Sequence, residues 1–191
     1  MRKIILTVSS LFAMLLAMTA FGQNQPISFT NEKMLSEIDN VIVSHPDFSV
    51  IQMEDAADVK NGEMYKVARI IDVNLNMSNC GTTDILPDGT KVWRLLITSD
   101  GAKALKVMCE NFYLPQGSSL FVYNENRNQV LHLTSADNPR GSYYSPKMIQ
   151  GGKLYLEYVA PSGVSEDAVL DIDGISYFYR GVESYVGYYE K

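Results

Sequence analysis

Between residues 63 and 181, apolar side chains recur at every second position in short runs, and turn residues separate the runs. The clearest run contains Trp93, Leu95 and Ile97. A period of two is typical of strands with one buried face, so this run predicts a strand whose apolar side chains enter the core. Further strands are predicted at residues 67–75, 105–110, 120–123, 130–133, 154–159 and 175–179. Many short strands without a strong helix between them predict an all-β fold, an antiparallel β-sandwich that is jelly-roll-like.

Two stretches inside this region are predicted to be irregular. Residues 76–89 read as a long loop that is closed by the turn Pro87-Asp88-Gly89. Asp171 to Gly174 shares part of the spacing of a calcium-binding loop, but Val169 stands where another oxygen ligand is needed. We therefore expect an exposed turn at residues 171–174 and no metal site.

The first 22 residues differ from the rest of the chain. Arg2 and Lys3 precede an apolar run from Ile4 to Phe21, and the small residue Gly22 follows directly before Gln23. This order is typical of a signal peptide that is cleaved after Gly22. A membrane anchor is the competing interpretation, and the lack of a basic flank after the run argues against it. We expect a secreted, periplasmic or cell-surface protein that has no membrane contact after cleavage.

A short helix and a linker are predicted for residues 23–62. The apolar residues that recur there at helical spacing are Met34, Leu35, Ile38, Val41 and Ile42. Pro46 requires this helix to end before it. Residues 48–62 read as a linker in which the acidic cluster of Glu54, Asp55 and Asp58 is solvated.

These patterns divide the chain into four parts. They are a signal peptide at residues 1–22, a helix and linker at 23–62, a β-sandwich domain at 63–181 and a tyrosine-rich tail at 182–191.

Cys80 and Cys109 are the only two cysteines. An exported protein can join them in a disulfide, which would close a loop of about 30 residues and add roughly 3.5 kcal/mol to stability. The alternative is two reduced thiols, with Cys109 packed as a small apolar side chain on a strand. The sequence leaves both alternatives open.

The residue types that support catalysis are scarce. The chain has two histidines, and its net charge of −6 disfavours nucleic acid as a partner. His45 stands before a proline, and His132 alternates with leucines, so we expect surface or structural roles for both. Nucleotide-binding loops, serine nucleophile elbows and metalloprotease motifs are absent from the sequence. We predict no catalytic, cofactor-binding or metal-binding residues, no cofactor and no enzymatic activity of this chain.

Several consecutive segments carry a resemblance to a known family. They are Val92–Ala102, Leu105–Phe112, Leu114–Tyr123, Gly151–Tyr158 with Pro161, and Tyr179-Arg180-Gly181. This succession resembles the non-catalytic N-terminal region of secreted bacterial serine endopeptidase precursors of the lysyl endopeptidase, trypsin-like kind. The resemblance covers residues 65–181 and implies a β-sandwich pro or accessory domain. In that family a protease domain with a Gly-Asp-Ser-Gly nucleophile follows, and it is absent from this sequence, so no catalytic residue carries over.

Four residues of these segments have predicted structural roles. Trp93 is expected to anchor the core, with Leu154 and Leu156 as its partners. Arg94, Glu157 and Arg180 lie on or beside predicted strands, and we expect a cross-strand charge network among them.

Three hypotheses for function remain. The first is a pro or accessory domain that assists or covers a serine protease domain, joined in cis in relatives. The second is a stand-alone secreted module that binds a glycan or a protein through tyrosine-bearing surfaces. The third is a small hydrolase with an unrecognised pair of carboxylates.

Overall fold

The structure is a computed structural model that describes residues 25–31, 33–64 and 66–181. Its helical elements are η1 (Ile27–Phe29), α2 (Lys33–Ser36) and α3 (Phe48–Asn61). Its strands are β1 (Asp39–Ile42), β2 (Ala68–Leu75), β3 (Thr82–Ile85), β4 (Lys91–Thr98), β5 (Ala104–Tyr113), β6 (Ser119–Asn124), β7 (Val130–Leu133), β8 (Ile149–Gln150), β9 (Lys153–Ala160) and β10 (Val169–Phe178).

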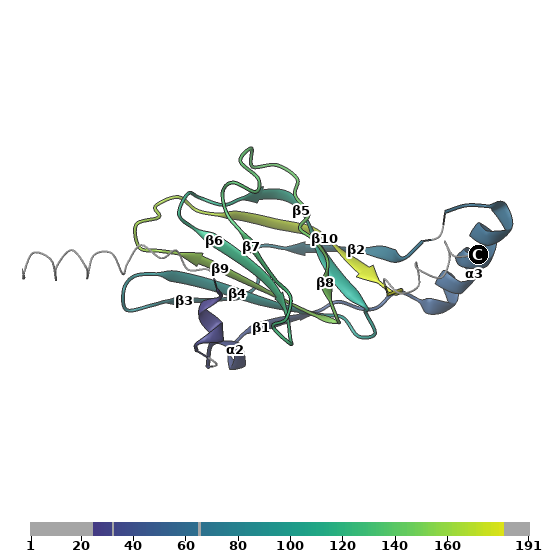
Figure 1. Cartoon of the computed structure of the whole chain (residues 1–191), viewed down its shortest axis with the longest axis horizontal. Helices are drawn as coiled ribbons and strands as arrows, with labels where there is room; N and C mark the ends of the chain where they lie inside the picture. Colours follow the sequence, from purple (N-terminus) through teal and green to yellow (C-terminus); the bar gives the residue numbers. More distant parts are fainter. Residues whose placement is uncertain (1–24, 32, 65, 182–191) are drawn as a thin grey trace, which may run out of the picture.

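In the described part of the chain, the strands form two sheets that pack face to face, and α3 stands beyond one end of them (Figure 1). The six-stranded sheet has the order β1-β4-β9-β6-β7, with β3 also paired to β4. The four-stranded sheet has the order β2-β10-β5-β8. This architecture confirms the predicted all-β sandwich with a short helix, whereas its jelly-roll connections stay a prediction. Strand β1 is parallel to β4, a local departure from the antiparallel pattern.

The core lies between the two sheets. Trp93, Leu95 and Ile97 of β4 are buried there, as the alternating pattern predicts. Leu154 and Leu156 of β9 lie opposite Ile97 and Leu95 in the strand pairing and belong to the same buried cluster. Because paired residues share one face of a sheet, β4 and β9 present a continuous apolar surface to the other sheet.

Strand β10 contains the stretch that was predicted to be an exposed turn, so that prediction is wrong. Ile172 and Ile175 are both buried in the core although they are three positions apart. In a regular strand, residues at an odd separation point to opposite faces. The pairing of β10 with β2 and β5 shifts between Ile172 and Gly174. This bulge, which includes the exposed Asp173, returns Ile175 to the core face.

The single helix predicted over residues 34–42 is also wrong. Helix α2 has only four residues, and strand β1 follows it. Strand β1 pairs with the second half of β4, and β3 pairs with the first half. Strand β3 itself lies within the predicted loop at residues 76–89. Together β1 and β3 satisfy the backbone groups along this edge of β4, and that requirement outweighs the helical spacing of the apolar residues.

Residues 48–61 form helix α3 where a linker was predicted. The Asp47 carboxylate accepts the backbone N–H of Ser49 at 2.8 Å and caps the start of the helix. Gly62 ends it in a left-handed conformation with a φ of 69°. Both end signals are present in the sequence, but an apolar face is not, and this is why the helix was missed.

Candidate functional site

The outer face of the six-stranded sheet is covered by the N-terminal segment, defined here as residues 25–31 and 33–36. Met34 of α2 is buried in a cluster with sheet residues Val92, Phe121, Tyr123 and Val159. Ile27 and Phe29 of η1 pack against this cluster. The ring of Phe29 meets that of Tyr123 edge-on, with 5.0 Å between their centroids. This sheet therefore buries apolar side chains on both of its faces.

The carboxylate of Glu157, on β9, lies at the centre of the covered face and has an exposed fraction of 0%. Its Oε1 accepts the backbone N–H of Ile27 at 2.5 Å and that of Ser28 at 3.2 Å. Its Oε2 accepts the hydroxyl of Tyr123 at 3.3 Å. A carboxylate that loses its hydration needs such donors. Two of these three donors belong to the N-terminal segment, so Glu157 fastens the segment to the sheet.

Tyr123, on β6, extends this polar cluster. Its hydroxyl oxygen lies 2.9 Å from the Oγ of Ser28, which is fully buried. Burial first, and then the negative charge of Glu157, raise the pKa of Tyr123 above its usual range. The phenol therefore stays protonated near neutral pH and donates to Glu157, and Ser28 in turn donates to the phenol oxygen.

Arg94, on β4, lies directly opposite Glu157 in the strand pairing and is 1% exposed. Its Nη2 forms an ion pair with Asp84 of β3. Its Nε and Nη1 are buried, and neither has a hydrogen-bond partner among the residues that the structure describes. Arg94 and Glu157 are thus neighbours in the strand pairing, but the guanidinium pairs with Asp84, while two backbone amides and the Tyr123 hydroxyl supply the hydrogen bonds of Glu157.

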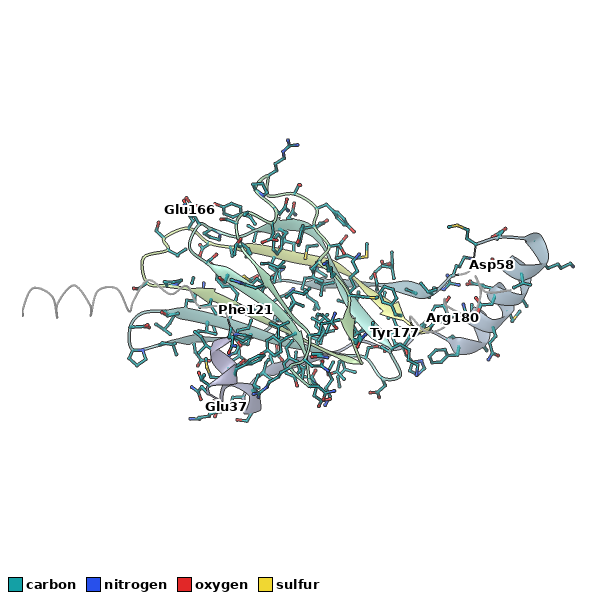
Figure 2. All side chains as sticks on the ribbon, in the orientation of Figure 1. Glu37, Asp58, Phe121, Glu166, Tyr177 and Arg180 are labelled. Atoms are coloured by element: carbon teal, nitrogen blue, oxygen red, sulfur yellow. The ribbon has the colours of Figure 1, made fainter. Side chains whose placement is uncertain are left out.

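Arg180 lies apart from this cluster, at the end of the sandwich where α3 is found (Figure 2). Its guanidinium forms an ion pair with Asp55 of α3, and its Nη1 donates to the backbone carbonyl of Lys66. The expectation that Arg180 joins a charge network with Arg94 and Glu157 is therefore wrong. The reason is that Arg180 follows β10, in the other sheet, so the strand pairing keeps the two regions apart.

The acidic cluster of α3 faces the sandwich instead of the solvent, which corrects the prediction of a solvated stretch. Ile51, Glu54, Asp55 and Asp58 follow one another at a spacing that places them on one side of the helix. Ile51 and Asp58 are buried, and the other two are half-buried. Each carboxylate has a cation of its own, and the pairs are Glu54–Arg69, Asp55–Arg180 and Asp58–Lys66.

Cys80 and Cys109 are free thiols in the structure, which is the reduced alternative described above. The thiol of Cys80 donates to the carbonyl of Asn76 at 3.2 Å. The carbonyl of Cys80 accepts the indole N–H of Trp93 at 2.9 Å. Burial raises the pKa of the Cys109 thiol to about 12. Cys109 therefore stays protonated and packs as a small apolar side chain.

Neither histidine has the surroundings of a catalytic base. His45 is exposed, and its ring stacks on Phe48 with 5.3 Å between centroids. His132 is exposed on β7, where its Nε2 lies 2.9 Å from the Oγ of Ser119 and its ring stacks on Phe121. A nucleophilic serine needs a histidine that a third group orients. Within the described ranges, no carboxylate is hydrogen-bonded to either histidine ring.

Acidic side chains gather at one cavity in the described part of the chain. Glu110, Asp171 and Asp173 line a cavity of about 380 Å³. No group of three or more His, Cys, Asp or Glu side chains in the described residues is placed to hold a metal ion. No helix in the same ranges is both long and apolar enough to cross a lipid bilayer.

Sequence reasoning placed Glu157 in a charge network but missed that it binds the N-terminal segment. The available signal was a single charged residue within the apolar run of β9, a pattern that suggests a buried and satisfied charge. Its main donors are backbone amides of residues 27 and 28, and backbone groups carry no sequence signal.

A family model described as the lysyl endopeptidase N-terminal domain matches residues 82–179 of the chain. The match runs from β3 to the end of β10 and covers just over half of the sequence. It includes Glu157, Tyr123 and Arg94, whereas the N-terminal segment and α3 precede it. The chain therefore belongs to the lysyl endopeptidase N-terminal domain family.

Proposed function

We propose that this chain is the non-catalytic pro or accessory β-sandwich of a secreted serine endopeptidase precursor, and that it assists the folding of a protease domain or covers it. The observation that carries this proposal is the family match over residues 82–179. The match spans most of the sandwich rather than a short motif, so it bears on the role of the folded unit as a whole.

The polar groups of the covered face support a structural role. The Glu157 carboxylate is occupied by donors of the same chain. The raised pKa of Tyr123 favours the protonated phenol, which is a hydrogen-bond donor rather than a base. The pair of Ser119 and His132 lacks an orienting carboxylate among the described residues. These features fit a domain that contributes its shape and its surface rather than a reaction.

Export is part of the same proposal. Residues 1–22, predicted to be a signal peptide, lie outside the described residues. Their order of a basic start, an apolar run and a small residue at the end supports cleavage after Gly22. Mass spectrometry of the protein recovered outside the cytoplasm is expected to find Gln23 at its N-terminus. An intact Met1 in the membrane fraction would contradict export.

The DNA beyond the codon for Lys191 gives the first test of the proposal. We expect an in-frame continuation that encodes a serine protease domain with a Gly-Asp-Ser-Gly nucleophile. A stop codon followed by no serine endopeptidase gene would overturn the proposal. That result would favour the alternative of a stand-alone module that binds a glycan or a protein.

The second test measures activity. The purified chain starting at Gln23 is expected not to cleave casein or lysyl and arginyl esters, because a nucleophile, a base and an orienting group are not assembled in its described part. The double variant His45→Ala/His132→Ala is the control. Turnover that copurifies with the chain and disappears in the double variant would overturn the non-catalytic role.

A further inference from the structure

A cavity of about 250 Å³ lies where the turn after β5 meets the loop between β9 and β10. Tyr113, the last residue of β5, pairs with Val169, the first residue of β10. This pairing brings the loop before Val169 back to the ring of Tyr113. Glu166 on that loop lies at the end of the sandwich away from α3 (Figure 2). None of the residues that line the cavity belongs to the polar cluster around Glu157.

Two hydrogen-bonded turns form the walls of this cavity. The backbone N–H of Ser118 donates to the carbonyl of Pro115 at 3.1 Å and closes the turn after β5. The N–H of Val164 donates to the carbonyl of Pro161 at 2.9 Å and closes a turn in the loop before β10. The side chain of Val164 packs against the core. Both walls are therefore attached to the sandwich close to the cavity.

The Tyr113 phenol and the Glu166 carboxylate are joined within the cavity lining. The hydroxyl of Tyr113 donates to Oε2 of Glu166 at 2.5 Å. This hydrogen bond first, and then burial, raise the pKa of the Tyr113 phenol, so the phenol stays protonated and remains the donor. In the described ranges, no lysine, arginine or histidine lies within ion-pair distance of Glu166. The tyrosine thus orients a carboxylate that has no counter-ion there.

The lining suits one cationic side chain better than a larger ligand. The cavity is smaller than the roughly 300–1,000 Å³ of pockets that hold drug-sized molecules. The face of the Tyr113 ring attracts a cation, and Glu166 accepts charge-assisted hydrogen bonds. Gln116 and Ser165 also line the cavity and offer further oxygen acceptors. A guanidinium matches this lining because it is a planar cation that stacks on aromatic rings and carries several donors.

We propose that this cavity binds the guanidinium of an arginine side chain from a protein partner, with Glu166 as its counter-ion and the Tyr113 ring as its stacking surface. The net charge of −6 favours association with a basic surface. Arginine is also among the residues that most often anchor protein interfaces. This binding does not require a protease as the partner, and so it goes beyond the proposed function.

An NMR titration of the full chain with N-acetylarginine amide tests the proposal. The control ligand is N-acetylcitrulline amide, which has nearly the same shape but no charge. Backbone amide signals of residues 116–117 and 163–166 report binding at the cavity, and those of β4 and β9 report whether a variant still folds. We expect saturable shifts at the cavity with the arginine compound and binding at least tenfold weaker with the citrulline compound.

Three variants separate this site from the general charge of the chain. Glu166→Gln keeps the shape of the side chain and is expected to weaken binding at least fivefold. Asp167→Asn is the matched control, because Asp167 is the next residue, its side chain is 97% exposed and it does not line the cavity. Its expected effect is less than twofold. Tyr113→Leu removes the ring and is expected to weaken binding two- to fivefold, roughly the strength of an exposed cation–π contact.

Equal losses for Glu166→Gln and Asp167→Asn would overturn the proposal, because the attraction would then come from general charge. Equal binding of the citrulline compound would overturn it as well, and so would the absence of saturable shifts with the arginine compound. Unchanged affinity in Tyr113→Leu would overturn the role of the ring. Methyl glycosides are the last probe: shifts of the same amides with them, and none with the arginine compound, would assign the cavity to a saccharide instead.

Discussion

Helix α3 stands beyond one end of the sandwich and is attached there by three ion pairs, whereas the N-terminal segment lies flat on a sheet and is attached by buried apolar side chains around Glu157. The ion pairs of α3 lie at a partly exposed boundary of the sandwich. The Glu157 carboxylate, in contrast, is fully buried beneath the N-terminal segment. These two segments, which are close in sequence, are thus attached to the same sandwich by different interactions: ion pairs hold α3, and buried apolar contacts hold the N-terminal segment.

The difference predicts how each attachment responds to conditions. Ion pairs near the surface weaken as salt screens them, since the Debye length falls to about 3 Å at 1 M ionic strength. Buried apolar contacts do not depend on screening, and a buried carboxylate that already has its donors has little to exchange with solvent. High salt is therefore expected to loosen α3 and to leave the N-terminal segment in place.

The family match includes the sheet residues that hold the N-terminal segment and excludes the cations that hold α3. Glu157 and Tyr123, which receive the N-terminal segment, lie within residues 82–179. The three cations that hold α3 are Lys66, Arg69 and Arg180, and all of them lie outside that range. The receiving surface for the N-terminal segment is therefore part of the family's sandwich, and the attachment of α3 uses residues on either side of it.

The largest effect is expected from Glu157→Ala, which leaves the buried amides of Ile27 and Ser28 without an acceptor. A buried hydrogen-bond donor that loses its partner costs about 1–3 kcal/mol, and this variant removes the acceptor of three donors. Urea unfolding followed through the fluorescence of Trp93, the single tryptophan, measures the change in the free energy of unfolding.

Glu157→Gln is the matched control for this variant, because it keeps an oxygen acceptor and the side-chain shape while it removes the charge. We expect a smaller loss for it than for Glu157→Ala. A loss below about 1 kcal/mol for Glu157→Ala, the range of most surface substitutions, would show that the N-terminal segment does not depend on the carboxylate.

A smaller and local effect is expected from Asp55→Ala. Its side chain is 16% exposed and that of Arg180 is 19% exposed, so their pair is better shielded than a typical surface ion pair. We expect the opening free energy of α3 to fall by about 1–2 kcal/mol, with little change in the sandwich. Hydrogen exchange of the α3 amides measures this.

Glu37→Ala provides the comparison for Asp55→Ala. It breaks the pair of Lys33 and Glu37, whose side chains are 78% and 65% exposed, and its expected effect is within about 0.5 kcal/mol. Equal effects of the two variants would mean that the ion pairs of α3 are no stronger than solvated ones.

The smallest effect is expected from pH. The hydrogen bond with Asp58 raises the pKa of Lys66 above its usual value of 10.5. Because the folded pKa is the higher one, the contribution of Lys66 is complete below the unfolded value and is lost as the pH rises through the folded value. Stability is thus expected to decline through this group only in alkaline solution.

Lys66→Arg separates this group from the tyrosines and cysteines that also titrate there, since an arginine keeps its charge at every pH used. The difference in the free energy of unfolding between the two proteins is expected to stay constant up to about pH 10 and then to grow in favour of the arginine variant. A difference that stays constant throughout would show that Lys66 does not support α3.

Features of the fold could be predicted from the sequence where their pattern depends only on residues that are close together in the chain. Trp93, Leu95 and Ile97 reveal the inward face of β4 because a period of two depends only on neighbouring positions. Ile172 and Ile175 mislead the same method, because the bulge between them is set by the pairing of β10 with two other strands. Helix α3 escapes detection because acidic residues stand where an apolar face was sought.

The candidate site was less predictable than the fold. The sequence suggests that Arg94 and Glu157 belong to one charge network across strands. It does not suggest that residues 27 and 28, about 130 positions before Glu157, supply its donors. Nor does it suggest that Arg180 binds a helix far upstream, because a charge carries no information about its partner until the topology is known.

The position of β10 has a mechanical consequence. This strand is paired with β2 along one edge and with β5 along the other, and the chain leaves it towards α3. A pulling force applied beyond Gly181 would first load the contacts of Arg180 and would then run along the strand. Since both ladders lie parallel to that pull, their hydrogen bonds would bear the load together in shear rather than open one by one. The pair of Arg180 and Asp55 would therefore break before the sheet opens. The other two ion pairs of α3 use Lys66 and Arg69, which lie outside the pulled strand, so the helix would stay attached after that first contact is lost.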